Sequence, residues 1–506
     1  MSINKHFLLI YPKLTPNWEY VEDDPSVGVP VGLLLIASTL KKCGYNSKII
    51  DGTLYPDYMA RIDKYLNDAF MIGLSVMTSQ VYDGIKISEY IKKKKPEIPV
   101  VWGGIHPSLF PQQTCSDEVV DFVCIGAGEI TAVELSDVIT RGKDVSNISG
   151  IAYKKNGNVY VTAVRQYEDI NKLPSLDYDL LEKVEDYINR DVDISRILGG
   201  YKRRVLTLLT GLGCPFQCTF CINTVLWQKK QFLLSADRIV EDLERVVSKY
   251  GINFIIFRDE NFFTKKDRIV NFINKVKEKR LSFEWYANVR ANYFSPKYIS
   301  DNFMRSLKEI GAFRFAMGVE SASDFVRQEI IKKGIKLENV VESARLSNKY
   351  KVVISYSFMM GVPGETKKDT IKTISFMNTI KKINRYAHFY GPQLYRPYPG
   401  SELYQITKGY GFREPFTLRG WGGKSDKYIG YLNPEELKWL DDVKFYELVH
   451  LCMPFFFKKI SQVRARPIMV FEYIMIIVSR LRMICKFWQC RVEIIAFQIL
   501  KKFKII

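Results

Sequence analysis

The sequence predicts an α/β protein with a doubly wound N-terminal domain, a partial (β/α)6 barrel and a helical C-terminal region. Short apolar runs alternate with helical periodicity over residues 1–145, which is typical of a parallel sheet covered by helices. A second alternation of six strand and helix pairs follows over residues 201–405. Beyond residue 405 the alternation stops, and residues 406–506 are basic, aromatic and helical in pattern.

The N-terminal domain, residues 1–145, is predicted to hold five mostly parallel strands in a Rossmann-like sheet. Ligands of such sheets bind at the carboxyl ends of the strands. Two glycine-rich turns fall there, one at Gly103 and Gly104 followed by His106, and one at Gly126 and Gly128 followed by Glu129. The strands are expected at 6–11, 47–51, 70–76, 98–102 and 121–125, and the helices at 30–43, 59–69, 81–94 and 129–140.

Residues 146–200 are interpreted as a hairpin that turns at Asn156-Gly157, followed by a polar linker. The barrel then occupies residues 201–405, with its chemistry expected at the carboxyl ends of the strands. Its strands are predicted at 205–210, 253–258, 284–288, 313–319, 353–360 and 388–395, and its helices near 235–249, 266–279, 296–309, 336–349 and 367–382.

Composition limits the class of protein and its compartment. Of the 506 residues 47% are hydrophobic, which excludes a largely disordered chain. Nine cysteines, three of them grouped, do not resemble a secreted disulfide framework, and no uninterrupted apolar run reaches the length of a spanning helix. We therefore expect a cytoplasmic protein. The net charge of +19 favours an acidic partner: nucleic acid, an anionic membrane surface or a phosphorylated substrate.

Three cysteines follow the first barrel strand in the run Gly-Cys-Pro-Phe-Gln-Cys-Thr-Phe-Cys. Cys214, Cys218 and Cys221 have CxxxCxxC spacing, and thiolates on one loop can hold three irons of a cubane [4Fe–4S] cluster while the fourth iron stays open. The alternatives are a structural zinc site or three incidental core cysteines. Zinc prefers four ligands, and no fourth cysteine or histidine lies nearby in the sequence.

This loop resembles that of the radical S-adenosylmethionine (SAM) superfamily, and further strand ends match that family over roughly residues 200–405. The resemblance implies reductive cleavage of SAM to a 5′-deoxyadenosyl radical. It also implies roles for eight residues, although a structural role remains an alternative for each. Phe220 would pack beside adenine, Asp259 and Glu260 would accept from the methionyl ammonium, Arg290 would pair with the carboxylate, Glu320 and Ser321 would bind the ribose, and Gly361 and Gly364 would pass close to adenine.

A doubly wound domain ahead of such a barrel is similar to the cobalamin (B12)-binding class of radical SAM enzymes. The Asp-x-His-x-x-Gly motif that supplies an axial histidine in many cobalamin proteins is missing. Its absence argues against histidine ligation and weakens the inference of cobalamin without removing it, because many members of the class also lack the motif. The resemblance implies that the following residues line the cobalamin site: Ser75, Thr78, Gly103, Gly104, His106, Gly126, Gly128 and Glu129.

The resemblance implies cobalamin-dependent methylation of an unactivated carbon or of phosphorus. The alternative is a radical oxidative cyclase or rearrangement enzyme that acts on a tetrapyrrole or lipid. A tRNA methylthiotransferase is disfavoured because Cys43, Cys115 and Cys124 lack that group's pattern, so we do not expect nucleic acid as a partner. A non-catalytic metal-binding scaffold is the rival from another class.

The expected partners are a small or lipophilic substrate and an electron donor such as flavodoxin or ferredoxin. Residues 451–506 hold eleven Lys and Arg against two Glu, interleaved with apolar blocks. Such a pattern is typical of an amphipathic helix on the inner face of an anionic membrane, or of helices that complete the barrel and the substrate pocket.

Overall fold

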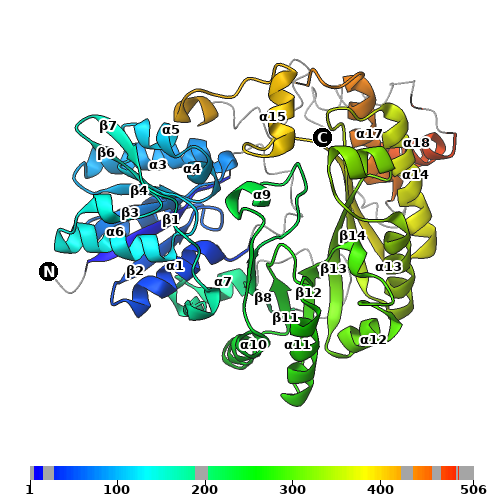
Figure 1. Ribbon diagram of the computed structural model, residues 1–506, viewed down its shortest axis with the longest axis horizontal. Helices are drawn as coiled ribbons and strands as arrows, with labels where there is room; N and C mark the ends of the chain where they lie inside the picture. Colours follow the sequence, from blue (N-terminus) through cyan, green and yellow to red (C-terminus); the bar gives the residue numbers. More distant parts are fainter. Residues whose placement is uncertain are drawn as a thin grey trace. The chain divides into compact units, whose positions relative to one another are not determined.

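A computed structural model describes residues 5–14, 28–188, 203–422, 437–457, 469–485 and 488 (Figure 1). The chain divides into two compact units. The first contains Met1–Gly213, Gln231–Arg258 and Arg413–Asn433, and the second contains Cys214–Lys230, Asp259–Phe412 and Pro434–Ile506. Among the described helices, none has the length and apolar character that crossing a lipid bilayer requires.

The first unit is built on a seven-stranded sheet of order β2-β1-β3-β4-β5-β6-β7. Its first five strands pair in parallel, as predicted. The strands are β1 (His6–Tyr11), β2 (Ser47–Asp51), β3 (Ala69–Ser75), β4 (Val100–Gly103), β5 (Phe122–Cys124), β6 (Ile151–Lys155) and β7 (Asn158–Val161). The sequence predicted five strands in this sheet, and the structure has two more, β6 and β7. The hairpin β6–β7 extends the sheet in antiparallel fashion, because β6 pairs with β5 and buries Ile151 and Ala152.

Helices cover both faces of this sheet (Figure 1). Helices α1 and α6 contact each other on one face, whereas α2, α3 and α5 contribute to a shared apolar core on the other. The helices are α1 (Val31–Lys42), α2 (Tyr58–Leu66), α3 (Val81–Lys94), α4 (Ile105–Leu109), α5 (Pro111–Ser116), α6 (Glu129–Arg141) and α7 (Val184–Ile188). The short helices α4 and α5 were not predicted, and α4 begins directly after the glycine-rich turn at Gly103 and Gly104.

The barrel strands form a second sheet, in chain order, of β8, β11, β12, β13, β14 and β15. In the first unit β8 pairs with β11 in parallel, and in the second unit β12 to β15 do so in succession. Their bounds are β8 (Val205–Leu208), β11 (Phe254–Phe257), β12 (Glu284–Asn288), β13 (Ala312–Glu320), β14 (Val353–Met360) and β15 (Ala387–Leu394). A short antiparallel pair, β9 (Gly211–Gly213) and β10 (Gln231–Leu233), flanks the cysteine loop.

Serine side chains cap the first turn of two barrel helices. Ser235 accepts a hydrogen bond from the Arg238 amide at the start of α10, and Ser300 caps α12, which is why that helix begins at Asp301 rather than at 296. The helices are α9 (Asn223–Leu226), α10 (Ala236–Tyr250), α11 (Lys266–Glu278), α12 (Asp301–Glu309), α13 (Leu337–Tyr350), α14 (Lys367–Ile383) and α15 (Glu402–Gly409).

Two further helices, α17 (Val443–Phe456) and α18 (Met469–Cys485), are described in the C-terminal region. They contact each other, and α17 also contacts β15. The core of the second unit centres on Trp285, which is fully buried among the rings of Phe262, Phe272 and Phe315. The helical prediction for residues 406–506 is confirmed for the described part; the remainder lies outside the described residues.

Candidate functional site

The cysteine loop lies between β9 and α9, and hydrogen bonds from Thr219 fix its backbone. The Thr219 amide donates to the Ile331 carbonyl at 3.1 Å, and its hydroxyl donates to the Ile330 carbonyl at 2.8 Å. The Thr219 carbonyl accepts from the Leu403 amide at 2.9 Å. Thr219, which lies between the second and third cysteines, therefore ties the loop to two distant segments of the chain.

The three thiols are free and lie near one another. Cys218 is buried, and Cys214 and Cys221 are partly buried. Burial raises the pKa of the Cys214 thiol and raises the pKa of Cys221 to about 11, and the neighbouring Cys218 contributes to both increases. Iron binds thiolates and not thiols, and burial disfavours the thiolate form. The positive charge of the cluster's iron atoms would have to stabilise the thiolates instead.

The donor set fits a three-ligand cubane cluster. In the described residues, no three His, Cys, Asp or Glu side chains converge on a point that a single metal ion could occupy. A cubane places each thiolate on a different iron, so its ligands do not need to converge in that way. Three mutually interacting thiols on a preformed loop meet this requirement.

Arg290, which follows β12, points at the cysteine loop. Its Nη1 donates to Cys218 Sγ at 3.7 Å, and its guanidinium lies 3.6 Å from the centroid of the Phe216 ring. The other two guanidinium nitrogens also donate: Nε to Asn292 Oδ1 at 3.3 Å, and Nη2 to the Lys333 carbonyl. The sequence-based role for Arg290 was the SAM carboxylate, whereas the structure directs one of its donors to a cysteine.

A second cation, Lys333, stands beside the third cysteine. Its Nζ lies 3.0 Å from Glu320 Oε1 at the end of β13 and 5.6 Å from the centroid of the Phe220 ring. Its charge opposes the rise in the pKa of Cys221. Glu320 adopts a left-handed backbone conformation with φ of 69°, a strained geometry that concentrates at functional sites. The structure thus brings Phe220 and Glu320 together through a lysine that sequence reasoning missed.

The other predicted SAM residues divide into two groups. Glu260 lies near the loop, since its charge raises the pKa of Cys214. Asp259 is fully buried, with a carboxylate oxygen 3.5 Å from the Arg268 guanidinium of α11. Ser321 is buried as well, 3.2 Å from the Thr373 hydroxyl, and its Oγ accepts from the Ser323 amide. These contacts are structural, and binding of SAM by Asp259 and Ser321 stays a prediction.

Gly361 and Gly364 have positive φ values of 70° and 88°. The Gly361 carbonyl accepts from Trp439 Nε1 at 2.8 Å, and an added Cβ would lie 2.6 Å from Leu394 Cδ1, so close packing explains this glycine. Glu365, one residue beyond Gly364, is buried, and burial raises its pKa to about 7. Adenine contacts at the two glycines stay predictions.

The predicted cobalamin residues after β3 and β4 lie close together in the first unit. Gly104 has a φ of 94°, and an added Cβ would lie 2.8 Å from the Val76 amide and 3.2 Å from Ser75 Oγ, so only glycine fits there. His106 Nδ1 is 3.3 Å from the Thr78 hydroxyl. The glycine at 103 ends β4, next to this turn.

The second glycine-rich turn adjoins the first. The Gly126 amide donates to Ser108 Oγ at 2.9 Å, and Ser108 Oγ donates to the Gly104 carbonyl at 2.7 Å, which links the two turns. An added Cβ at Gly128 would lie 2.9 Å from Ile36 Cδ1 of α1. Burial raises the pKa of Glu129, which begins α6. The two turns are thus joined through Ser108 at the carboxyl ends of the strands, the place where such sheets bind ligands.

His106 is fully buried beneath aromatic rings. Its ring lies 5.2 Å from that of Phe110 and 5.5 Å from that of Trp421, centroid to centroid. Its Nε2 has no hydrogen-bond partner in the described part of the chain, and burial lowers its pKa to about 3. His106 is therefore a neutral imidazole packed in the domain core, and a role facing the cofactor stays a prediction.

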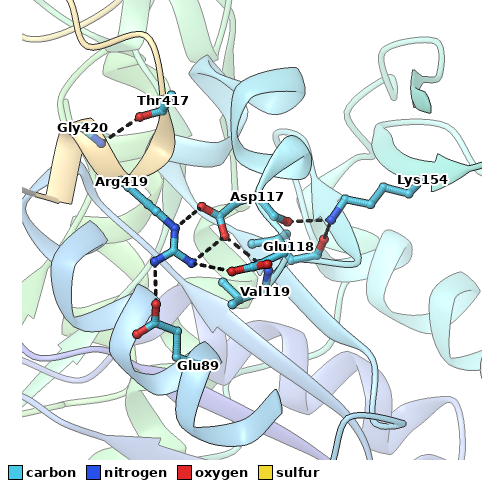
Figure 2. A network of polar contacts seen from close by, with 9 residues as sticks. Glu89, Asp117, Glu118, Val119, Lys154, Thr417, Arg419 and Gly420 are labelled. Carbon is cyan, nitrogen blue, oxygen red and sulfur yellow. Dashed lines mark hydrogen bonds and ion pairs between the residues drawn. The ribbon is translucent and has the colours of Figure 1, made fainter. Parts of the chain in front are cut away.

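Trp421 belongs to a segment after the barrel, residues 413–422, that we call the return segment. Leu418 and Trp421 are members of the N-terminal core, and both are almost fully buried. Arg419 of the same segment reaches Glu89, Asp117 and Glu118, as Figure 2 shows. No pattern in the sequence associates this segment with the first domain.

Comparison with known proteins identifies the class. The radical SAM superfamily model matches residues 208–377, and the B12 binding domain model matches residues 20–136. A protein of Pyrococcus horikoshii named as an uncharacterized methyltransferase is 30% identical over 389 residues, which cover 76% of this chain and 79% of the relative. The chain belongs to the radical SAM superfamily and carries a B12-binding domain.

Other relatives of this radical SAM enzyme differ in reaction. The anaerobic magnesium-protoporphyrin IX monomethyl ester cyclase of Rubrivivax gelatinosus is 22% identical over 392 residues, 74% of this chain and 66% of the relative. The cytidylyl-2-hydroxyethylphosphonate methyltransferase of Streptomyces wedmorensis is 23% identical over 403 residues, 70% of this chain and 72% of the relative.

Solved structures share the fold. The radical SAM methyltransferase TsrM of Kitasatospora setae, with tryptophan and a SAM analogue bound, has a TM-score of 0.65 at 17% identity, covering 81% of this chain and 77% of that one. The cobalamin-dependent enzyme OxsB, with aqua-cobalamin and SAM bound, has a TM-score of 0.70 at 16% identity, covering 99% and 76%. The predicted fold class and the cofactor set of a [4Fe–4S] cluster, SAM and cobalamin are confirmed at the level of the family.

Proposed function

We propose that this radical SAM enzyme transfers a methyl group to an unactivated carbon or to phosphorus of a small or lipophilic substrate. The observation that carries the proposal is the preformed three-cysteine loop with two buried cations, in a chain that also has a B12-binding domain. When bound, the [4Fe–4S] cluster supplies the electron that cleaves SAM, and cobalamin supplies the methyl group.

The chain's own residues would divide the work as follows. Cys214, Cys218 and Cys221 would bind the cluster. Lys333, which contacts both Glu320 and the Phe220 ring, would hold these two predicted SAM residues together. Glu260, whose charge raises the pKa of Cys214, would accept from the methionyl ammonium. The proposed SAM set also includes Asp259, Ser321, Gly361 and Gly364, whereas Arg290, for which the sequence predicted the SAM carboxylate, contacts Cys218. The proposed cobalamin set is Ser75, Thr78, Gly103, Gly104, His106, Gly126, Gly128 and Glu129.

We propose domains at residues 1–145 (cobalamin), 146–200 (hairpin and linker), 201–405 (radical SAM barrel) and 406–506 (helical region). The family models fall within the first and third of these ranges.

Anaerobic reconstitution tests the function. Wild-type protein is expected to bind about four iron and four sulfide per chain, to retain hydroxocobalamin absorption through desalting, and to release 5′-deoxyadenosine with dithionite and SAM. Cys214→Ala, Cys218→Ala and Cys221→Ala are expected to abolish this release, because each removes one ligand of a three-ligand site. The exposed Cys43 gives the matched control, Cys43→Ala. Metal binding by the wild type without SAM cleavage would instead support the scaffold.

Oxidative cyclisation is the second candidate, because cyclases from Rubrivivax gelatinosus and other bacteria are among the relatives. The two reactions differ in what SAM leaves behind. Methylation converts SAM to S-adenosylhomocysteine as well as 5′-deoxyadenosine, and transfers its labelled methyl group to product, whereas cyclisation leaves the methyl label in methionine. The reconstituted enzyme, incubated with methyl-labelled SAM and cell extract as the source of substrate, distinguishes the two by whether the label appears in product or in methionine.

We also propose a cytoplasmic location, with flavodoxin or ferredoxin as the electron donor. The thiols of the following cysteines are free, as a reducing compartment would keep them: Cys43, Cys115, Cys124, Cys214, Cys218, Cys221 and Cys452. The net charge of +19 would attract an acidic electron carrier. Reduction of the cluster by either carrier, slowed by added salt, is the expected result.

Peripheral contact with an anionic membrane is proposed through one face of α18. This face is apolar and exposed although the opposite face packs inward with Met475 and Ile476. Cationic residues flank the helix in the sequence on both sides. The exposed residues, 40–53% accessible and spaced like one helix face, are Tyr473, Ile474, Ile477 and Leu481.

Sedimentation with vesicles tests this contact. The full chain is expected to sediment with vesicles that contain phosphatidylserine and to stay in solution with pure phosphatidylcholine. Ile477→Glu should weaken sedimentation, whereas Val164→Glu, at an exposed valine of the first unit, should not. Equal recovery in solution with both vesicles, or dimerisation through this face by light scattering, would contradict the membrane contact.

A further inference from the structure

We propose that Arg290 is a positioning residue for the cluster: it donates an N–H to the Cys218 thiolate and raises the reduction potential of the [4Fe–4S] cluster. This inference rests on the proposed function, because it assumes a cluster on the three cysteines. The direct observation is the contact between Arg290 Nη1 and Cys218 Sγ at 3.7 Å, which spans 72 residues of sequence.

The guanidinium is fixed in this direction by its other contacts. Its flat face lies on the Phe216 ring at 3.6 Å, and Phe216 belongs to the same loop as the cysteines. Nε donates to Asn292 Oδ1, and Nη2 donates to the Lys333 carbonyl. One face and two of the three nitrogens are therefore committed to neighbours, and the third nitrogen is aimed at Cys218. A planar, rigid group held at this number of points does not turn toward another ligand without breaking several contacts.

Charge balance indicates which group Arg290 serves. Its side chain is 8% exposed, and a buried guanidinium stays protonated and requires a negative partner. No carboxylate lies within ion-pair distance of it in the part of the chain that the structure describes. Lys333 differs, since Glu320 neutralises it at 3.0 Å. The negative group that the structure offers Arg290 is the Cys218 thiolate, which forms when iron binds.

Hydrogen bonds to cysteine sulfur are one of the means by which proteins set the potential of an iron–sulfur cluster. One-electron reduction by the electron donor adds one negative charge to the cluster and its thiolates, and no bond in the protein breaks. A positively charged donor at Cys218 stabilises the reduced form more than the oxidised form. Removal of the donor should therefore make the cluster harder to reduce.

The test is a redox titration monitored by electron paramagnetic resonance on reconstituted full-length protein without SAM. Arg290→Gln is expected to keep the cluster and to lower its midpoint potential, so that the ratio of reduced to oxidised cluster at a fixed potential falls about tenfold. Arg290→Lys keeps the charge and loses the fork, so its shift should have the same sign and be smaller.

Arg314 supplies the matched control. It is also a buried arginine of the barrel, 4% exposed, and it donates to Ser355 Oγ at 2.8 Å and to the Tyr390 hydroxyl at 2.6 Å. It has no contact with a cysteine among the described residues. Arg314→Lys should leave the midpoint potential unchanged, which separates a local effect at Cys218 from a general disturbance of the barrel.

Each outcome decides the matter. An unchanged midpoint potential in Arg290→Gln overturns the inference. If the potential is unchanged but SAM binds more weakly, Arg290 is assigned to the SAM carboxylate. If Arg290→Gln fails to assemble a cluster, the midpoint potential of Arg290→Lys decides: a wild-type value overturns the inference. A wild-type protein that binds no cluster refutes the proposed function itself, a result recognised before any variant is measured.

Discussion

The return segment offers a test of which contacts hold it on the N-terminal domain. Figure 2 shows Arg419 with three acidic partners, at 2.5 Å from Glu89, 3.0 Å from Asp117 and 3.4 Å from Glu118. Arg419 is 45% exposed, so solvent screening limits these ion pairs to about 1 kcal/mol in total. Trp421 is 1% exposed, and replacing a buried tryptophan by alanine costs about 3–5 kcal/mol.

We therefore expect Trp421→Ala to free the return segment and Arg419→Ala to leave it docked. An anchor free energy of about 3 kcal/mol corresponds to an increase in the opening constant of about a hundredfold, against about fivefold for 1 kcal/mol. Hydrogen exchange measured on peptides from residues 413–422 reports this constant, and Trp421→Phe should give an intermediate rate because it keeps one ring. Equal acceleration by Arg419→Ala and Trp421→Ala would refute the assignment of the anchor to apolar burial.

Three further predictions concern single buried groups. Burial lowers the pKa of His106 to about 3, so as the pH falls below about 6.5 the unfolded chain takes up a proton that the folded chain does not, and stability is lost. His106→Leu should therefore reduce the fall in melting temperature between pH 7 and pH 5. Burial raises the pKa of Glu365 to about 7, so the folded chain keeps this proton to a higher pH than the unfolded chain does. The free energy of unfolding should therefore fall by roughly 3 kcal/mol as the pH rises from about 4.5 to 7. Glu365→Gln should flatten that part of a plot of unfolding free energy against pH, and an unaltered plot would contradict burial of the acid. An added Cβ at Gly318 would lie 2.2 Å from Glu320 Oε1 and 2.7 Å from Lys333 Nζ. Because both atoms are the ends of flexible side chains, Gly318→Ala should fold but should displace the pair and raise the dissociation constant of SAM in equilibrium dialysis. Unaltered binding would place the Glu320–Lys333 pair outside the SAM site.

The fold was predictable from sequence where the relevant contacts are local. Strand and helix periodicity depends on neighbours within a few positions. The cysteine loop was predictable for the same reason, since CxxxCxxC places its three ligands on one short segment. The cap at Ser300 was not used in the prediction, which therefore began α12 at 296 instead of Asp301. Local patterns failed at the β6–β7 hairpin: its turn was recognised, but its pairing with β5 depends on the edge of a sheet formed by distant residues.

The surroundings of the site were not predictable, because tertiary contacts assemble them. Arg290 meets Cys218 across 72 residues, and Lys333 meets Glu320 through a π-helical turn at Phe325–Ile330 that has no recognisable signature. Asp259 was assigned to SAM because it ends a strand, yet the neighbouring α11 supplies Arg268 as its partner. Position at a strand end identified the region of chemistry without saying which side chains turn toward it.

The hydrogen bonds of Thr219 also bear on when iron can be loaded during biogenesis. Its partners reach as far along the chain as Leu403, so the loop does not acquire its final shape until that residue has left the ribosome and joined the barrel. Delivery of the cluster by an assembly protein would accordingly come late in synthesis or after it.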